Sequence, residues 1–143
     1  MKFVAPIARI LLGLVFVVFG INYFVPFMPA QPPPPPEALP LLGGLVASKM
    51  LTFVKIIEIG AGVLLLANRF VPLATAVLAP IVIAITFVHV MLVPSGLLIA
   101  VVLVALELAL AWSYRSAFAP MLRAKVIPDT APVETKAKHL AVA

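Results

Sequence analysis

The sequence predicts an all-α membrane protein, a four-transmembrane-helix bundle with a short interfacial helix between spans 1 and 2. Composition is the first observation, since 64% of the 143 residues are hydrophobic, 10% are charged, and the mean hydropathy is +1.25. These values lie far outside those of soluble globular domains. The second is a series of apolar runs, each close to the roughly 20 residues that cross about 30 Å of hydrocarbon. The third is that the cations gather near the ends of these runs, as membrane topology requires.

The first expected span covers residues 4–24. Pro6 lies in its first turns, where the missing backbone N–H is tolerated. Gly13 and Gly20 fall on one face of this helix, so they allow a neighbouring helix to approach closely. A basic start followed by an apolar run is also typical of a signal peptide. Arg9 interrupts the run, however, and the run is too long, so we expect an uncleaved span.

The long connection, residues 25–49, contains an unbroken run of prolines at residues 32–36. Such a run forms polyproline II, and we interpret it as a stiff spacer rather than as a ligand for a proline-binding domain. The apolar residues that follow are interrupted by Pro40 and by Gly43 and Gly44, so they are too few to cross a bilayer. They predict a short interfacial or partly re-entrant helix packed on the bundle.

The remaining spans are expected at residues 50–67, 71–92 and 97–114. Pro80 lies inside the third span and should kink it. Trp112 and Tyr114 end the fourth span, where aromatic residues commonly mark the membrane interface.

We divide the chain into a transmembrane domain, residues 1–124, and a basic tail, residues 125–143. Arg69 and the tail lie on the same side as the N-terminus, and the proline-rich connection lies on the other. The positive-inside rule therefore places both termini in the cytoplasm. The net charge of +5 does not indicate nucleic-acid binding, because the cations lie at the ends of the spans. The chain has no cysteine, which excludes thiol nucleophiles and iron–sulfur or zinc–thiolate sites.

Four polar residues define a candidate ligand-binding cluster near the outer side of the bundle. Lys55 is expected roughly 8 Å below the outer end of the second span and Glu58 roughly 12 Å below it. Their spacing puts them on one helix face, where they can pair. Asn22 and His89 end the first and third spans on the same side. Ionisable groups at such depth mark either a functional site or a fastening between helices, and both interpretations fit these residues.

A second pair is expected nearer the cytoplasmic side. Arg9 should lie roughly 8 Å deep in the first span and Glu107 roughly 10 Å deep in the fourth, which predicts a structural ion pair between them. No residues suggest a metal site. Intrinsic haem is also disfavoured, because the only histidine besides His89 is His139 in the tail.

Four segments of the chain form a recognisable pattern. They are ARILLGLVFVVFGINYF at residues 8–24, KIIEIGAGVLLLANRFVPLATAVLAPIVI at 55–83, FVHVMLVPSG at 87–96 and ELALAWSYRSAFAPML at 107–122. Together they resemble the DoxX family of small four-helix membrane proteins. The resemblance implies a bundle in the bacterial inner membrane and a link with quinol oxidation, thiosulfate:quinone oxidoreductase activity or redox stress. It supplies no agreed catalytic role for any residue.

Three functions are compatible with these residues. The first is an accessory subunit of a membrane redox assembly, with a quinone or similar amphiphile near the cluster and no intrinsic cofactor or catalytic residue. The second is a structural or assembly subunit in which the polar groups only fasten helices. The third is a small-molecule or lipid transporter that acts as an oligomer. We favour the first, so the expected partners are the lipid bilayer and either other membrane subunits or further copies of the chain.

Overall fold

The computed structural model describes residues 3–126 and residue 141, and this part of the chain is helical without a strand. Four long helices are present: α1 (Val4–Phe24), α3 (Met50–Leu66), α4 (Val71–Met91) and α5 (Leu97–Ser113). Shorter elements are α2 (Leu39–Ala47), α6 (Arg115–Phe118) and the 3-10 turns η1 (Pro36–Ala38), η2 (Pro94–Gly96) and η3 (Ala119–Leu122). Most of the expected basic tail lies outside the described residues, so its boundary stays a prediction.

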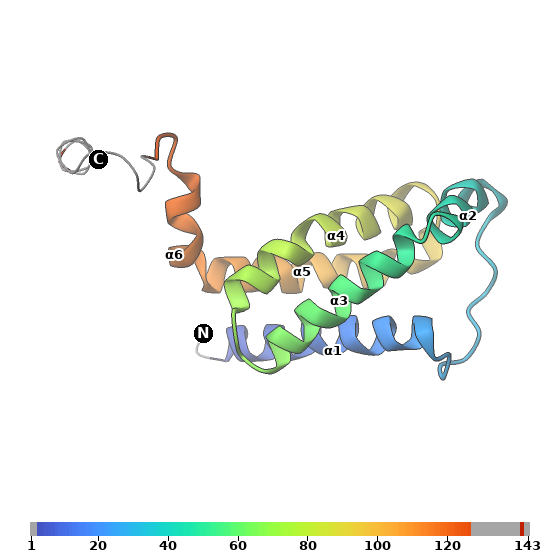
Figure 1. Ribbon diagram of the computed structural model, residues 1–143, viewed down its shortest axis with the longest axis horizontal. Coiled ribbons are helices and arrows are strands. Elements are labelled where there is room, and N and C mark those ends of the chain that lie inside the picture. Colours follow the sequence, from blue (N-terminus) through green and yellow to red (C-terminus); the bar gives the residue numbers. More distant parts are fainter. Residues whose placement is uncertain (1–2, 127–140, 142–143) are drawn as a thin grey trace.

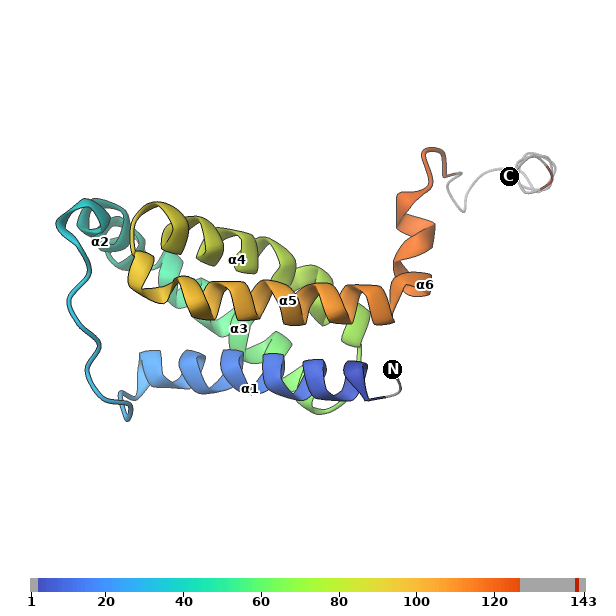
Figure 2. The same cartoon turned by 180° about the vertical axis from the view of Figure 1, so that it is seen from behind.

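The four long helices lie side by side in a bundle (Figures 1 and 2). α1 packs most extensively against α3 and also contacts α5, while α4 contacts α5 and α3, so the helices follow each other around the bundle as α1, α3, α4, α5. The start of α1 and the end of α5, with α6 beyond it, lie at one end of the bundle. The long connection and α2 lie at the opposite end, where α2 packs against α3.

The backbones of α1 and α3 touch at two glycines. A Cβ atom added to Gly13 would lie 3.0 Å from the carbonyl oxygen of Gly62, and one added to Gly62 would lie 3.0 Å from the carbonyl oxygen of Gly13. A Cβ atom on Gly20 would meet Ile59 Cγ1 of α3 at 2.5 Å. The expectation that Gly13 and Gly20 face a neighbouring helix is therefore confirmed, and small residues bring these two helices together as they do in membranes.

A core of alanine, leucine, valine and phenylalanine side chains fills the bundle, with the fully buried Leu12, Leu65 and Leu78 near its centre. The outer surface is apolar as well: Leu98 is 79% exposed, Ile83 69% and Phe53 59%. Helices that are hydrophobic all round belong in lipid or in the core of a large protein. Three segments are long and apolar enough to cross a membrane: Val4–Phe24, Val71–Met91 and Pro94–Ser113. α3 has 17 residues and is shorter.

The connections between the helices follow from their residues. Asn68 has a left-handed φ of 55°, a conformation that asparagine tolerates, and the N–H of Arg69 closes the end of α3 by bonding to the carbonyl of Leu64 at 3.0 Å. Pro72 then lies in the first turn of α4, where proline is favoured. In the long connection, Pro35 has φ −55° and ψ 149°, as in polyproline II, and α2 confirms the expected short helix. α4 is assigned as one helix from Val71 to Met91, so the kink expected at its internal proline stays a prediction.

Candidate functional site

A buried ion pair on α3 is the most distinctive polar feature of the bundle. Lys55 Nζ lies 2.7 Å from Glu58 Oε2. The Glu58 side chain is 2% exposed and that of Lys55 is 19% exposed. Because the two residues are three apart on one helix, their side chains meet on the same face, as the sequence predicts. The expectation that they can pair is confirmed.

The α1–α3 interface runs along the face that carries this pair. A Cβ atom on Gly20 of α1 would lie 3.6 Å from the backbone oxygen of Lys55, so α1 passes directly over this turn of α3. One turn nearer the end of the bundle, the hydroxyl groups of Tyr23 and Thr52 form a 2.9 Å hydrogen bond between the two helices. Sequence analysis missed this contact. The spacing of Thr52 and Lys55 on one helix face was the signal that could have indicated it.

Asn22 and His89 do not hydrogen-bond with the ion pair. The Asn22 side-chain oxygen accepts hydrogen bonds from the backbone N–H groups of Phe27 and Met28, at 3.0 and 2.9 Å, and so shapes the start of the long connection. The Nδ1–H of His89 donates to the carbonyl oxygen of Val93 at 3.1 Å. Both residues therefore stabilise local turns, and the described residues contain no hydrogen-bonded cluster of all four. Any part that Asn22 and His89 take in ligand binding stays a prediction.

The His89 ring also packs against the turn before α5. A Cβ atom on Gly96 would lie 2.2 Å from His89 Cε1, so no side chain fits at that position while the ring stays in place. The ring occupies the space that a side chain would need, which explains the glycine in the Pro94–Gly96 turn.

The expected ion pair between Arg9 and Glu107 is not formed. Arg9 Nη1 instead donates hydrogen bonds to the carbonyl oxygens of Leu65 and, at 3.1 Å, Leu66. Glu107 is 7% exposed, and neither of its carboxyl oxygens has a hydrogen-bond partner in the part of the chain that the structure describes.

The physical reason for this correction is the end of α3. The last carbonyl groups of a helix lack partners within the helix and form the negative end of its dipole, so they attract a cation. Gly13 and Gly62 hold α1 close to this end of α3, and Arg9 is one helical turn before Gly13. A prediction from depth alone places Arg9 and Glu107 at similar levels but cannot say which helix Arg9 faces.

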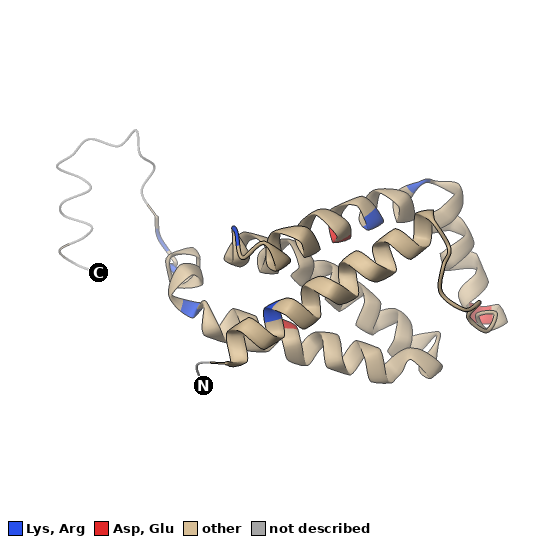
Figure 3. Ribbon diagram, turned by 90° about the horizontal axis from the view of Figure 1, so that it is seen from below, with Lys and Arg blue, Asp and Glu red and all other residues tan. Residues whose placement is uncertain are grey.

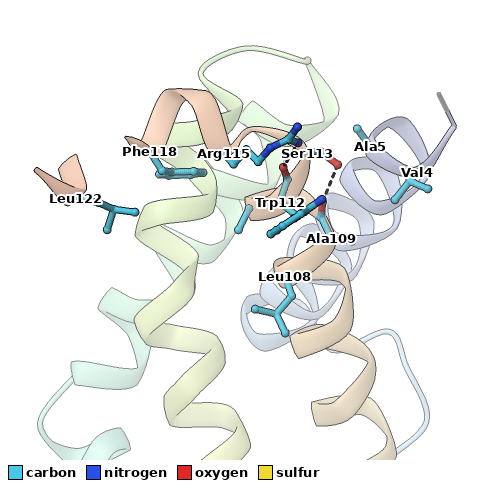
Figure 4. A pocket seen from close by; sticks show the side chains of 10 residues that line it. Val4, Ala5, Leu108, Ala109, Trp112, Ser113, Arg115, Phe118 and Leu122 are labelled. Carbon is cyan, nitrogen blue, oxygen red and sulfur yellow. Dashed lines mark hydrogen bonds between the residues drawn. The ribbon is translucent and has the colours of Figure 1, made fainter. Parts of the chain in front are cut away.

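An open groove lies at the end of the bundle that carries α6 (Figure 4). Its volume is about 1110 Å³, and its apolar walls include Val4 and Ala5 of α1, Leu108 and Ala109 of α5, and Phe118 and Leu122 beyond α5. At the rim, the guanidinium carbon of Arg115 lies 5.3 Å from the centre of the Trp112 ring, and Arg115 Nη1 donates to the Trp112 carbonyl oxygen at 3.1 Å. Sequence analysis placed Trp112 at the membrane interface but did not anticipate the groove.

Comparison with known families agrees with this architecture. A family model described as DoxX matches residues 4–91, which is more than half of the chain. The chain belongs to the DoxX family. The match contains the Lys55–Glu58 pair and ends with α4. The buried Glu107 lies beyond it, and so does every groove residue except Val4 and Ala5. Neither the comparison with curated proteins nor that with solved structures finds a match. DoxX membership and the apolar helices together identify a small integral membrane protein in contact with the lipid bilayer.

Proposed function

We propose that this DoxX protein is an accessory subunit of a redox assembly in the bacterial inner membrane. In this proposal it crosses the membrane four times, keeps both termini in the cytoplasm and has no redox centre of its own. Lys55 and Glu58 provide polar groups for a quinone or a similar amphiphile with carbonyl groups. Other membrane subunits supply the catalytic chemistry.

The observation that supports this proposal is that the buried ion pair belongs to a single helix. Lys55 and Glu58 are both on α3, so the contact between them does not join two helices. A buried ion pair also adds little net stability compared with well-packed apolar side chains. Intramembrane ionisable residues are costly and commonly mark ligand or proton sites. A pair that ties no helices together is better explained by a function than by bundle stability.

Lys55 and Glu58 offer a quinone a small number of polar contacts. An ammonium group has three N–H donors, and Lys55 uses one for Glu58, with no other hydrogen bond to the described residues. Its partial exposure leaves the others accessible from outside the bundle. A bound quinone would supply electron and proton transfer, Lys55 would donate to its carbonyl oxygen, and Glu58 would hold or release a proton. Asn22 and His89 already bond to nearby backbone groups, so the proposal rests on Lys55 and Glu58, and the part of Asn22 and His89 in quinone binding stays a prediction.

Two features support four spans rather than three. α3 contains 17 residues, the same number as α5, and is therefore about 26 Å long, close to the hydrocarbon thickness of a bilayer. It also packs along α1 and α4, both of which are long enough to span. Lysine and arginine gather towards the end of the bundle that carries the start of α1 and the region after α5 (Figure 3), which favours cytoplasmic termini.

The test compares quinone and partner retention in three proteins expressed at normal level: the wild type, Glu58→Gln and Glu107→Gln. Each is purified in mild detergent, and the lipid-soluble cofactors and accompanying proteins are identified. Wild type should carry quinone and partner subunits. Glu58→Gln should lose most of the quinone, because it removes the titratable group and the charge that holds Lys55. Glu107→Gln makes the same chemical change on α5 and should keep it.

Wild-type quinone content in Glu58→Gln would contradict the proposed site. If partner subunits still co-purify in that case, the protein would be a structural or assembly subunit of the same complex. Equal loss of quinone in both variants would indicate a general effect on the bundle and would also argue against a site at Glu58.

A further inference from the structure

The groove beside α6 combines an apolar channel with a cation at one end. Its walls are parts of α1 and α5 that belong to spanning segments, and Leu108 in one wall is 63% exposed. Arg115 lies at the rim, just past the end of α5, together with the interfacial residue Trp112 (Figure 4). α5 rises by about 8 Å from Leu108 to its end at Ser113, and Arg115 follows beyond that end, so the groove runs from hydrocarbon depth towards headgroup level.

The charges at this end favour an anionic occupant. Arg115 lies just beyond α5, and Arg69 lies in the turn at the same end. The carboxyl group of Glu107 is the only acidic side chain among the described residues after α3, and it is buried. An anion at the rim therefore meets cations without a competing surface carboxylate from the described chain.

We propose that this groove binds one anionic glycerophospholipid, with an acyl chain between α1 and α5 and the phosphate held by Arg115. A guanidinium group has five N–H donors in a planar fork that matches phosphate oxygens. Arg115 Nη1 already donates to the Trp112 carbonyl, which fixes the side chain over the indole ring and leaves further N–H groups for a ligand. The apolar walls distinguish a lipid from free phosphate, because phosphate alone would leave them without an occupant. This inference is independent of the proposed function, since no groove residue belongs to α3.

The single tryptophan of the chain makes the site directly observable. Trp112 lines the groove and is the only tryptophan in the sequence, so its fluorescence reports on this position alone. The protein is reconstituted in vesicles of equal parts phosphatidylglycerol and phosphatidylcholine, with bromine on the acyl chains of one lipid or the other. Bromine quenches tryptophan at close contact. The ratio of quenching by the two lipids, taken within each variant, cancels changes in the emission of the tryptophan itself.

Wild type should be quenched at least threefold more strongly by brominated phosphatidylglycerol than by brominated phosphatidylcholine. Arg115→Gln should bring this ratio close to one. Arg123→Gln is the matched control, because it removes the same charge from an exposed residue that is not part of the groove. A wild-type ratio of one would overturn the proposal. So would an equal loss in both variants, since that result would show only a general attraction of anionic lipid to a basic surface.

A second variant covers the case in which Arg115→Gln does not insert or fold. Ala5→Phe fills the groove from the α1 side and keeps Arg115, so it should also lower the quenching ratio. Ala84→Phe adds the same volume at an exposed position of α4 and should leave the ratio unchanged. Wild-type preference in Ala5→Phe would show that the acyl chain lies elsewhere and would overturn the proposed site.

Discussion

Arg9 of α1 donates a 3.1 Å hydrogen bond to the carbonyl oxygen of Leu66 in the last turn of α3. The same guanidinium nitrogen also bonds to the Leu65 carbonyl, so one side chain of the first helix caps the end of another. With these two carbonyl partners, the Arg9 guanidinium group does not need a carboxylate partner. It explains why Arg9 and Glu107 remain separate although both lie at the same end of the bundle.

Double-mutant analysis of Arg9 and Glu107 should show two independent residues. Arg9→Leu removes the charged donor that bonds to the carbonyl groups at the end of α3. This change should lower the free energy of unfolding by about 1.5–3 kcal/mol. Glu107→Leu removes a buried carboxyl group without a partner and should be neutral or stabilising. The coupling energy between the two changes should lie within about 0.5 kcal/mol of zero. Reversible unfolding in mixed micelles gives all three values. A coupling energy above about 2 kcal/mol would show that Arg9 and Glu107 do form an ion pair.

The glycine contact between α1 and α3 predicts that two glycines of the same helix respond oppositely to alanine. Gly62→Ala places a methyl group 3.0 Å from the Gly13 carbonyl oxygen and 2.8 Å from Val17 Cγ2, so the helices must separate. We expect a loss of about 1–3 kcal/mol in the free energy of unfolding.

Gly60→Ala is the matched control, because nothing lies within 4 Å of its added methyl group. Alanine favours helix over glycine, so this change should be neutral or stabilise by up to about 1 kcal/mol. The same unfolding measurement serves both variants. Similar losses at the two positions would show that α1 and α3 do not approach closely at Gly62.

The helices were predictable because their signals are local. Apolar runs bounded by Asn68, by the Pro94–Gly96 turn and by the proline-rich connection place each of the four long helices within one residue of its expected ends. The Lys55–Glu58 pair was predictable for the same reason, since the geometry of a single helix brings residues three apart together.

Contacts between elements were less predictable, because they depend on helix rotation and loop conformation. Depth indicated that Arg9 and Glu107 lie at similar levels, but the partner of Arg9 depends on which helix the glycines bring closest. Asn22 and His89 bond to backbone groups of turns whose shape the sequence does not specify. The groove at Arg115 requires the chain to turn away from the axis of α5 after Ser113, which no periodicity in the sequence indicates.

Topology can be tested with single cysteines, because the chain has none of its own. Ala30→Cys lies in the exposed long connection, and Ala124→Cys lies in the exposed segment after η3. If the bundle spans the membrane four times with cytoplasmic termini, a membrane-impermeant thiol reagent added outside intact cells should label the first and not the second. Both should react after the membrane is permeabilised. Labelling of position 124 alone would invert the orientation, and labelling of both from outside would indicate three spans.

The ion pair on α3 should be dispensable for folding if it serves a ligand. Lys55→Met leaves the buried Glu58 carboxylate without its partner, so it should lower the free energy of unfolding by about 3–5 kcal/mol. Changing both residues, Lys55→Met with Glu58→Leu, replaces the pair with apolar side chains of similar size and should restore stability to within about 1 kcal/mol of wild type.

Stability and ligand retention then separate the two roles of the pair. The double variant should insert, fold and resist denaturant like the wild type, yet carry no quinone, because both polar groups are gone. A purely structural role predicts that the double variant keeps its stability and also keeps quinone and partner subunits, because apolar side chains can replace a buried ion pair without net loss. Because the two side chains belong to one helix and tie no second helix to it, we expect the stable protein without quinone.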